Sequence, residues 1–291
     1  MEQTIEKSRI SDTLIQQALL EDMGSKGDIT TDSIFLEDKD LSFKLIVNED
    51  AVLSGLDVLK RVFFLLDKNI LVKSDFRDGD LLKQSTVIVN INGSVKNILK
   101  GERTALNFLS HMSGIATLTQ ELVGKIKHTK AVLLDTRKTT PNLRFFEKQA
   151  VLAGGGKNHR FDLSEMVLIK DNHISAAGSI TEAMKKVRKN LVKLGKNTKI
   201  EIEVENVEEL KEAILCSPDV IMFDNWDVED LKSAVKLLPS NILSEVSGQI
   251  NLENIKSYAE TGINYISTSY MMKNSRWIDF SLETGRVKNE I

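Results

Sequence analysis

The chain has 291 residues, of which 41% are hydrophobic and 28% carry a charge, the balance of an ordinary soluble protein. Its net charge of -3 provides no basic field for nucleic acid or an anionic membrane, and no stretch approaches the ~20 apolar residues of a membrane span. The single cysteine, Cys216, excludes an internal disulfide and is best explained as a small buried hydrophobe. The first ten residues contain no apolar signal core, so we expect a cytoplasmic enzyme or binding protein.

The first part of the chain predicts a mixture of helices and strands. An apolar stripe over residues 14–19 follows Ser11, a good N-terminal cap, and precedes Gly24, which ends the predicted helix. The other predicted elements are strands over 41–47 and 85–91 and helices over 56–67 and 95–127. We therefore expect an α+β N-terminal domain over residues 1–115, with the C-terminal tail, residues 275–291, packed on it.

After residue 130 short apolar runs recur, and amphipathic helices separate the later ones. The runs cover residues 131–135, 166–170, 199–205, 219–224, 241–247 and 263–268, and the helices cover 207–215, 228–238 and 252–260. Alternating strands and helices indicate parallel strands with right-handed crossovers. The predicted fold class is α/β, with an incomplete α/β barrel of six or seven parallel strands over residues 116–274; an open doubly wound sheet is the alternative.

Polar and charged residues follow almost every predicted strand. Catalytic groups of an α/β barrel collect at these carboxyl ends. The six ends carry Asp135 to Lys138, Lys170 to His173, Glu203 with Glu205, Asp224 with Asn225, Ser247 with Gly248, and Ser267 to Ser269. Strand ends are often polar simply because they face solvent. That explains a few such residues, but not a set with so many charges of both signs.

The segment KIEIEVE predicts a row of carboxylates inside the barrel. Alternation along a strand places Glu201, Glu203 and Glu205 on one face and apolar residues on the other. If the apolar face meets the helices, the carboxylates point inward and need cations, because an unpaired buried carboxylate costs several kcal/mol. The candidate cations are Arg137, Lys138, Lys170 and a divalent metal. The alternative is an exposed edge strand whose acidic face lies in solvent.

The segment AGGGKNHR, residues 153–160, offers an anion site. Its glycines allow backbone N–H groups close approach, and Lys157, His159 and Arg160 add basic groups. A flexible helix exit is the usual explanation of a glycine triplet, but two other basic strand ends favour an anion. Together, the basic residues and the nearby carboxylates suit a polyanionic substrate with Mg²⁺. The usual phosphate-binding loops are absent from the sequence.

Several long motifs then identify a resemblance that covers residues 14 to 283. The segments GERTALNFLSHMSGIAT, DTRKTTPNLR, AVLAGGGKNHR, LIKDNHI, EVE and DN, with EDMGSKGDITT before them, resemble the quinolinate phosphoribosyltransferases in order and spacing. The resemblance implies transfer of ribose 5-phosphate from phosphoribosyl pyrophosphate to quinolinate, with loss of carbon dioxide, in NAD biosynthesis. It also implies Mg²⁺ as the cofactor and a homodimer in which the N-terminal domain of one subunit closes the barrel mouth of the other.

The resemblance also implies a role for each matching residue. Arg103 would reach the quinolinate pocket from the partner subunit, while Glu203 and Asp224 would bind the ribose hydroxyls and Mg²⁺, directly or through water. The implied catalytic residues are Lys138, Lys170, Glu203 and Asp224. The implied substrate-binding residues are Arg103, Thr136, Arg137, Lys138, His159, Arg160, Lys170, Glu203, Asp224, Ser247, Gly248, Ser267 and Ser269.

The chain departs from the family pattern at a few positions. Asn142 stands at a family glycine, and asparagine tolerates the left-handed conformation. Gln249 replaces the second glycine of the phosphate-binding SGG, Ser269 replaces a glycine, and the sequence from Tyr270 differs from the expected small residues. All but the first lie at the end that would bind the 5-phosphate.

Four alternative functions remain at this point. A molybdenum-transport accessory protein shares the fold, and LSEMVLI favours it, but GERTALN and KDNH do not match it. A second alternative is a phosphoribosyltransferase that acts on another aromatic acid. A third is an aldolase-like barrel with a Schiff base on Lys170, which the adjacent Asp171 disfavours. The last is a catalytically dead sensor, supported only by the altered phosphate segment.

Overall fold

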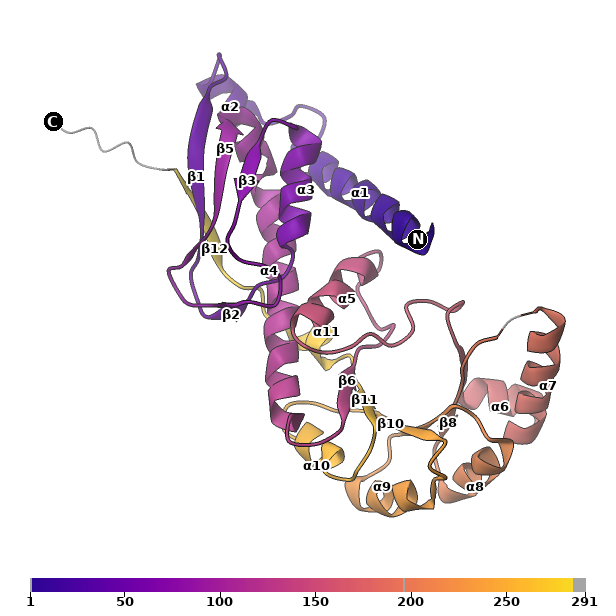
Figure 1. Cartoon of the computed structure of the whole chain (residues 1–291). Coiled ribbons are helices and arrows are strands. Elements are labelled where there is room, and N and C mark those ends of the chain that lie inside the picture. Colours follow the sequence, from indigo (N-terminus) through magenta and orange to yellow (C-terminus); the bar gives the residue numbers. More distant parts are fainter. Residues whose placement is uncertain (1, 196, 285–291) are drawn as a thin grey trace. The chain divides into compact units, whose positions relative to one another are not determined.

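The computed structural model describes residues 2–195 and 197–284, with side chains from residue 11 onward, and the chain forms two compact units (Figure 1). The first unit comprises Met1–Gln120, Thr140–Gly155 and Asn274–Ile291, and the second comprises Glu121–Thr139 and Gly156–Lys273. Among the described residues, no helix has both the length and the apolar character that crossing a bilayer requires.

An antiparallel sheet from distant parts of the chain organises the first unit. Its order is β12 (Phe280–Thr284), β1 (Asp40–Val47), β5 (Val87–Ser94) and β3 (Leu71–Lys73). A second small sheet pairs β2 (Ala51–Val52) with β4 (Leu81–Leu82). Part of the tail, residues 280–284, is therefore an edge strand beside β1, whereas residues 285–291 lie outside the described residues.

The first unit also contains helices, some of which carry a clear apolar face. They are α1 (Glu2–Met23), α2 (Ile29–Ile34), α3 (Leu56–Leu66), α4 (Val95–Ile126) and α5 (Arg144–Ala153). On α3 the side chains of Leu56, Leu59 and Phe63 recur at helical spacing and are buried. In α4, Gly114 allows a close chain crossing, because a Cβ there would lie 2.0 Å from the carbonyl oxygen of Arg276.

For the first helix, the predicted start is wrong and the predicted end is confirmed. The first helix begins at Glu2, so Ser11 lies inside it and does not cap it. The polar segment EQTIEKSRI contains good helix formers, which extend the helix without needing an apolar stripe. The helix ends where predicted, because Gly24 has a φ of 55° and its N–H donates to the carbonyl of Leu20.

The second unit contains the predicted parallel sheet. Its order is β6 (Val132–Leu134), β11 (Tyr265–Ser267), β10 (Leu243–Ser247), β9 (Val220–Asp224), β8 (Ile200–Val204) and β7 (Val167–Ile169), with every pair parallel. The helices of this unit are α6 (Asp171–Ala177), α7 (Ile180–Lys193), α8 (Val207–Cys216), α9 (Val228–Ala234), α10 (Ile255–Ala259) and α11 (Tyr270–Asn274). In Figure 1, helices α8, α9 and α10 follow the outer side of the curved sheet, as in an incomplete α/β barrel.

The strand register separates two faces of this sheet. Residues paired in parallel strands point to the same side. The pairs Glu203–Met222, Met222–Glu245 and Ser247–Ser267 therefore place polar side chains from several strands on one face, with Met222 between two of them. The other face carries buried Ile202, Ile221 and Val246, the side chains that pack toward the helices.

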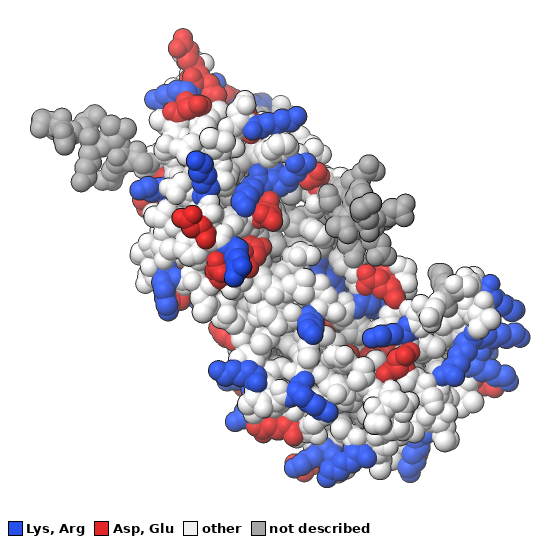
Figure 2. Space-filling model, in the orientation of Figure 1, with Lys and Arg blue, Asp and Glu red and all other residues white. Residues whose placement is uncertain are grey.

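Charged side chains of both signs are interspersed on the face drawn in Figure 2, which agrees with the small net charge. The largest group of basic side chains lies over α7, whose sequence is ITEAMKKVRKNLVK. This arrangement does not form the continuous basic stripe expected of a nucleic-acid-binding surface.

Candidate active site

The sheet of the second unit brings several predicted site residues to one edge. Thr136, Arg137 and Lys138 follow β6, and Lys170 follows β7. Glu203 lies within β8, and the other predicted residues end three strands, namely Asp224 on β9, Ser247 on β10 and Ser267 on β11. Because all these strands are parallel, their carboxyl ends meet at the same edge.

Cations and carboxylates interact at this edge. Lys170 Nζ lies 2.9 Å and 3.2 Å from the two carboxylate oxygens of Glu203. Burial and the nearby charge of Arg137 lower the pKa of Arg160, while Glu201 and Glu203 act in the opposite direction. Arg160 also donates from Nη1 to the carbonyl of Met166 at 3.0 Å. Two guanidinium groups therefore lie close enough to repel each other, beside acidic partners.

Beneath this edge the sheet buries a cluster that the sequence only partly predicted. Nε2 of His159 lies 3.0 Å from Oε2 of Glu201 and 3.6 Å from Oε1 of Glu245. Both glutamates are buried, at 0% and 2% exposure. Burial raises the pKa of Glu245 to about 8, with the charge of Glu201 adding to the effect, and burial raises the pKa of Glu201 to about 7.

The sequence analysis did not predict Glu245 as a site residue, although the alternation of side chains along its strand pointed to it. It lies two residues before Ser247 on the same strand, so alternation alone places both side chains on one face.

Only two of the three carboxylates expected inside the barrel lie within the strand. Glu201 and Glu203 belong to β8, but the strand ends at Val204 and Glu205 is exposed. Alternation fails there because Asn206 already caps the next helix through its side chain. Burial and then the charge of Glu209 raise the pKa of Glu205.

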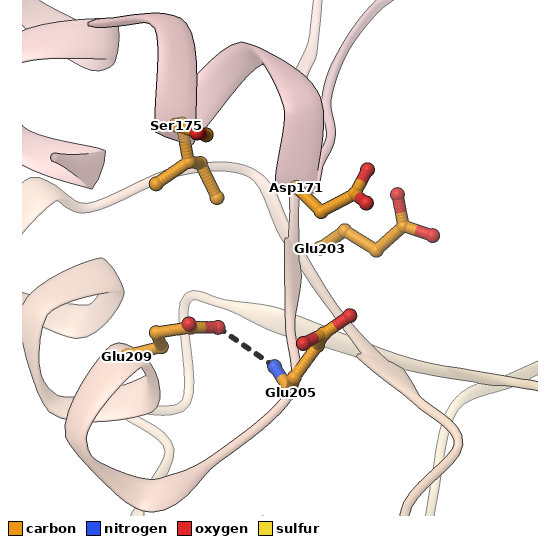
Figure 3. Close-up of a pocket in the computed structure, with 6 residues that line it drawn as sticks. Asp171, Ser175, Glu203, Glu205 and Glu209 are labelled. Atoms are coloured by element: carbon orange, nitrogen blue, oxygen red, sulfur yellow. Dashed lines mark hydrogen bonds between the residues drawn. The ribbon is translucent and has the colours of Figure 1, made fainter. Parts of the chain in front are cut away.

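A cavity of about 250 Å³ opens beside the ends of β7 and β8. Its lining is acidic, and in Figure 3 the carboxylates of Asp171 and Glu203 extend to the same side while Glu209 turns back to the backbone of Glu205. The lining residues are Asp171, Ile174, Ser175, Glu203, Glu205 and Glu209. Oxygen donors and room for water suit a hydrated hard cation such as Mg²⁺.

The turns that follow the strands explain two of the departures. Asn142 has a φ of 67°, as predicted for an asparagine that replaces a glycine, and Gln249 has a φ of 50°. Gly248 has a φ of 110°, and a Cβ there would lie 2.4 Å from Oδ1 of Asn225. Ser269, the third departure, lies directly before helix α11. Its carbonyl accepts a hydrogen bond from the N–H of Met272 at 3.2 Å.

Some predicted residues are not linked to this cluster. Lys138 is exposed on the loop after β6, where its N–H donates to Oγ1 of Thr136 at 3.0 Å. Arg103 is exposed on α4 in the first unit. In the glycine triplet, Gly154 has a packing role in the first unit, because a Cβ there would lie 2.4 Å from the carbonyl oxygen of Ala116.

The sequence matches two models of one family over most of its length. Residues 28–113 match the model described as quinolinate phosphoribosyl transferase, N-terminal domain. Residues 115–283 match the model of the C-terminal domain of the same family.

Named relatives and a solved structure agree with these matches. The chain is 42% identical over 270 residues to the probable carboxylating nicotinate-nucleotide pyrophosphorylase of Bacillus subtilis, covering 93% of this chain and 92% of the relative. It is 36% identical to a decarboxylating quinolinate phosphoribosyltransferase of Nicotiana glauca, covering 93% and 81% of the two chains. The structure of the nicotinate-nucleotide pyrophosphorylase from Francisella tularensis superposes with a TM-score of 0.89 at 39% identity, covering 95% and 96%.

Proposed function

This chain belongs to the quinolinate phosphoribosyltransferase family, and from this we propose that it joins quinolinate to the ribose 5-phosphate of phosphoribosyl pyrophosphate. The products are nicotinate mononucleotide, pyrophosphate and carbon dioxide. The chain is thus a pentosyltransferase of NAD biosynthesis, acting as a carboxylating nicotinate-nucleotide pyrophosphorylase. The observation that carries this proposal is the meeting of Arg137, Arg160 and Lys170 with Glu203 at one strand edge.

A dicarboxylate suits this edge because it adds negative charge beside two guanidinium groups that repel each other. Repulsion between Arg137 and Arg160 falls when an anion lies between them, so the bound quinolinate gains from a pair that is strained without it. Thr136 and Lys138 on the adjacent loop complete the pocket that we propose. Guanidinium groups also fix the orientation of a planar carboxylate through paired hydrogen bonds.

We assign the second substrate to the neighbouring strand ends. Glu203 and Asp224 share a face of the sheet and offer carboxylates to ribose hydroxyls and to Mg²⁺. When bound, Mg²⁺ neutralises charge on the pyrophosphate leaving group. Ser247, Gly248, Ser267 and Ser269 are proposed for the 5-phosphate, where the positive φ of Gly248 lets the backbone approach an anion.

The reaction needs positioning and charge neutralisation more than covalent chemistry by the protein. The pyridine nitrogen forms a bond to the anomeric carbon as the bond to pyrophosphate breaks, and the ring becomes cationic. The carboxylate next to that nitrogen then leaves as carbon dioxide, its electron pair remains on the ring carbon, and a proton replaces it. Residues that hold two polyanions in register lower the barrier through proximity and electrostatics.

A shared active site is the assembly that we propose. Arg103 is exposed on α4, and the resemblance assigns it to the quinolinate pocket of the partner subunit in a homodimer. A cytoplasmic location fits the single cysteine, because disulfides are rare in that compartment. Cell fractionation and a measured solution mass test these two points.

The direct test is an assay with quinolinate, phosphoribosyl pyrophosphate and Mg²⁺ that detects nicotinate mononucleotide. We expect product with quinolinate and none with nicotinate, since the second carboxylate both anchors the ring and leaves. Absence of product from the folded protein would reject the proposal, and activity with a different aromatic acid alone would favour the alternative substrate.

Subunit mixing tests the shared site. Arg103→Ala and Lys138→Ala are each expected to be inactive as homodimers. Random reassembly makes half of the dimers mixed, each with one intact site, so about a quarter of full activity returns. No recovery, despite measured subunit exchange, would remove Arg103 from the site of its partner.

Two of the alternatives receive little support. Nζ of Lys170, the atom that a Schiff base would use, is already engaged by both carboxylate oxygens of Glu203. Binding of molybdate in place of the two substrates would support the transport accessory protein instead.

A further inference from the structure

The chain turns sharply at Asn225, the residue that directly follows β9. Its φ is 58°, in the left-handed region that asparagine adopts more readily than most residues. Its backbone N–H donates to the carbonyl of Ser247 at 2.9 Å, one step beyond Asp224 and Ser247, the last pair between β9 and β10. The backbone of Asn225 is therefore held against β10, which fixes where its side chain starts.

The side-chain amide of Asn225 links the end of β9 with the turn after β10. Its Nδ2 donates to Oδ2 of Asp224 at 2.9 Å. On its other side, a Cβ on Gly248 would lie 2.4 Å from Oδ1 and 2.8 Å from Cγ of Asn225, so the amide fills the space that a side chain at position 248 would take. A carboxylate accepts hydrogen bonds but donates none, so the amide nitrogen must face Asp224 and its oxygen must face Gly248.

The carboxylate of Asp224 depends on this one contact within the protein. In the described part of the chain it accepts no hydrogen bond other than that from Asn225. The side chain is only half-buried, so packing alone does not select its orientation. A terminal carboxylate torsion is broad, and a donor in a fixed position restricts it. The other lone pairs of the carboxylate then keep a constant direction.

We propose that Asn225 is a positioning residue for the ribose end of the site. Its amide orients the carboxylate of Asp224 for the ribose hydroxyls and Mg²⁺, and it acts through Asp224 without touching the substrate. Because the same amide occupies the space left by Gly248, it also sets the spacing between the contacts for ribose and those for the 5-phosphate. This inference rests on the proposed function, which assigns Asp224 and Gly248 to phosphoribosyl pyrophosphate.

Two substitutions remove the amide and differ in backbone strain. Asn225→Gly tolerates the positive φ and Asn225→Ala does not, while both keep the N–H that donates to Ser247. Calorimetric titration with phosphoribosyl pyrophosphate and Mg²⁺, without quinolinate, measures binding in the absence of turnover. We expect both variants to bind about tenfold more weakly than wild type, because each loses one hydrogen bond to a charged group.

Stability and quinolinate binding are the controls for this loss. Asn225→Ala should unfold at a lower urea concentration than Asn225→Gly, although the two variants have the same affinity for phosphoribosyl pyrophosphate. The affinity for quinolinate alone should change by less than about twofold in both. A loss confined to Asn225→Ala would assign the effect to backbone strain, and an equal loss for quinolinate would assign it to the fold as a whole. Either result would overturn the proposal.

A direct contact between Asn225 and the substrate is the rival explanation. Asn225→Gly is therefore repeated in an Asp224→Ala background, where an amide that acts through Asp224 has nothing left to orient. We expect no further loss of affinity there, whereas a second tenfold loss would show a direct contact. Crystal structures without ligand provide an independent readout. We expect the Asp224 carboxylate of Asn225→Gly to be turned from its wild-type orientation, and an unmoved carboxylate would also overturn the proposal.

The same measurements separate this inference from the proposed function. If wild type binds phosphoribosyl pyrophosphate but forms no nicotinate mononucleotide, the proposed reaction is refuted and the Asn225 variants still test the contact. If wild type does not bind phosphoribosyl pyrophosphate, both are refuted. If Asp224→Ala binds too weakly to titrate, the orientation of the Asp224 carboxylate in crystals of Asn225→Gly decides.

Discussion

The two compact units each bury a histidine–glutamate pair of similar length, and the pairs differ in what completes them. In the first unit, Nε2 of His111 lies 3.1 Å from Oε1 of Glu147 on α5, and Oε2 of Glu147 accepts from the N–H of Thr140 at 3.1 Å. Both carboxylate oxygens are thus used. In the second unit, His159 meets Glu201, and Oε1 of Glu201 has no partner in the described structure.

This difference suggests that the His111–Glu147 pair is a structural contact, whereas the His159–Glu201 pair belongs to the candidate site. The first pair connects α4, α5 and the turn before α5, with both carboxylate oxygens paired, as stable interiors require. The second pair leaves Oε1 of Glu201 without a hydrogen-bond partner in the described structure, near Arg160, whose guanidinium is repelled by that of Arg137. Incomplete pairing in a buried cluster is therefore the feature that points to chemistry.

The largest effect is expected from breaking the His111–Glu147 pair. Glu147→Leu leaves the N–H of Thr140 and the ring of His111 without their carboxylate partner at a fully buried position, so the free energy of unfolding should fall by about 3 kcal/mol. Urea unfolding measures it. Glu147→Gln retains an acceptor and should lose less; equal losses would contradict the pairing argument.

Breaking an ion pair at the strand edge should act on the reaction instead. Lys170→Met removes a charge-assisted hydrogen bond of about 2 kcal/mol, so kcat/KM should fall at least about thirtyfold. Lys170 is 43% exposed, and the free energy of unfolding should change by only about 1 kcal/mol. A loss of stability with kcat/KM unchanged would reverse the assignment of roles.

The raised pKa of Glu245 predicts a dependence of stability on pH. The pKa of Glu245 is raised from 4.5 to about 8, so the native state holds a proton that the unfolded chain releases. Stability is therefore highest below pH 4.5 for this group and declines as the pH rises through about 8, by at most about 1.4 kcal/mol per pH unit. Urea unfolding from pH 5 to 9 should show a shallower decline in Glu245→Gln. Identical slopes would exclude the raised pKa.

The smallest effect is expected at an exposed pair of the same type. Nε2 of His128 lies 3.1 Å from Oε1 of Glu260, and the two side chains are 46% and 50% exposed. His128→Gln should change the free energy of unfolding by no more than about 0.5 kcal/mol, because solvent replaces such contacts. A change comparable with that of Glu147→Leu would show that burial does not rank these pairs.

Local patterns predicted the strands of the second unit and helices α8, α9 and α10, but not α6, α7 or α11, nor which residues of different strands meet. Alternation in KIEIEVE placed Glu201 and Glu203 on one face, and the glycine-like position of Asn142 predicted its positive φ. Glu245 lies on a different strand, and its approach to Glu201 depends on the register across β9. A single sequence does not contain that register, because it arises from how the helices pack on the sheet.

The His111–Glu147 pair in the first unit was missed for a related reason. His111 and Glu147 are 36 positions apart on two helices, and the apolar stripes that define those helices do not specify how the helices cross. The start of α1 was missed for a different reason. Polar residues with high helix propensity extend this helix to Glu2, where the sequence has no apolar stripe.

The pairing of β12 with β1 has a consequence for synthesis on the ribosome. Residues 280–284 complete a sheet whose other strands are made within the first 94 residues. Until they emerge, the edge of β1 displays unpaired N–H and C=O groups to any strand nearby. The N-terminal sheet is thus completed only after residues 280–284 have been synthesised, long after its other strands, and until then other contacts must cover that edge.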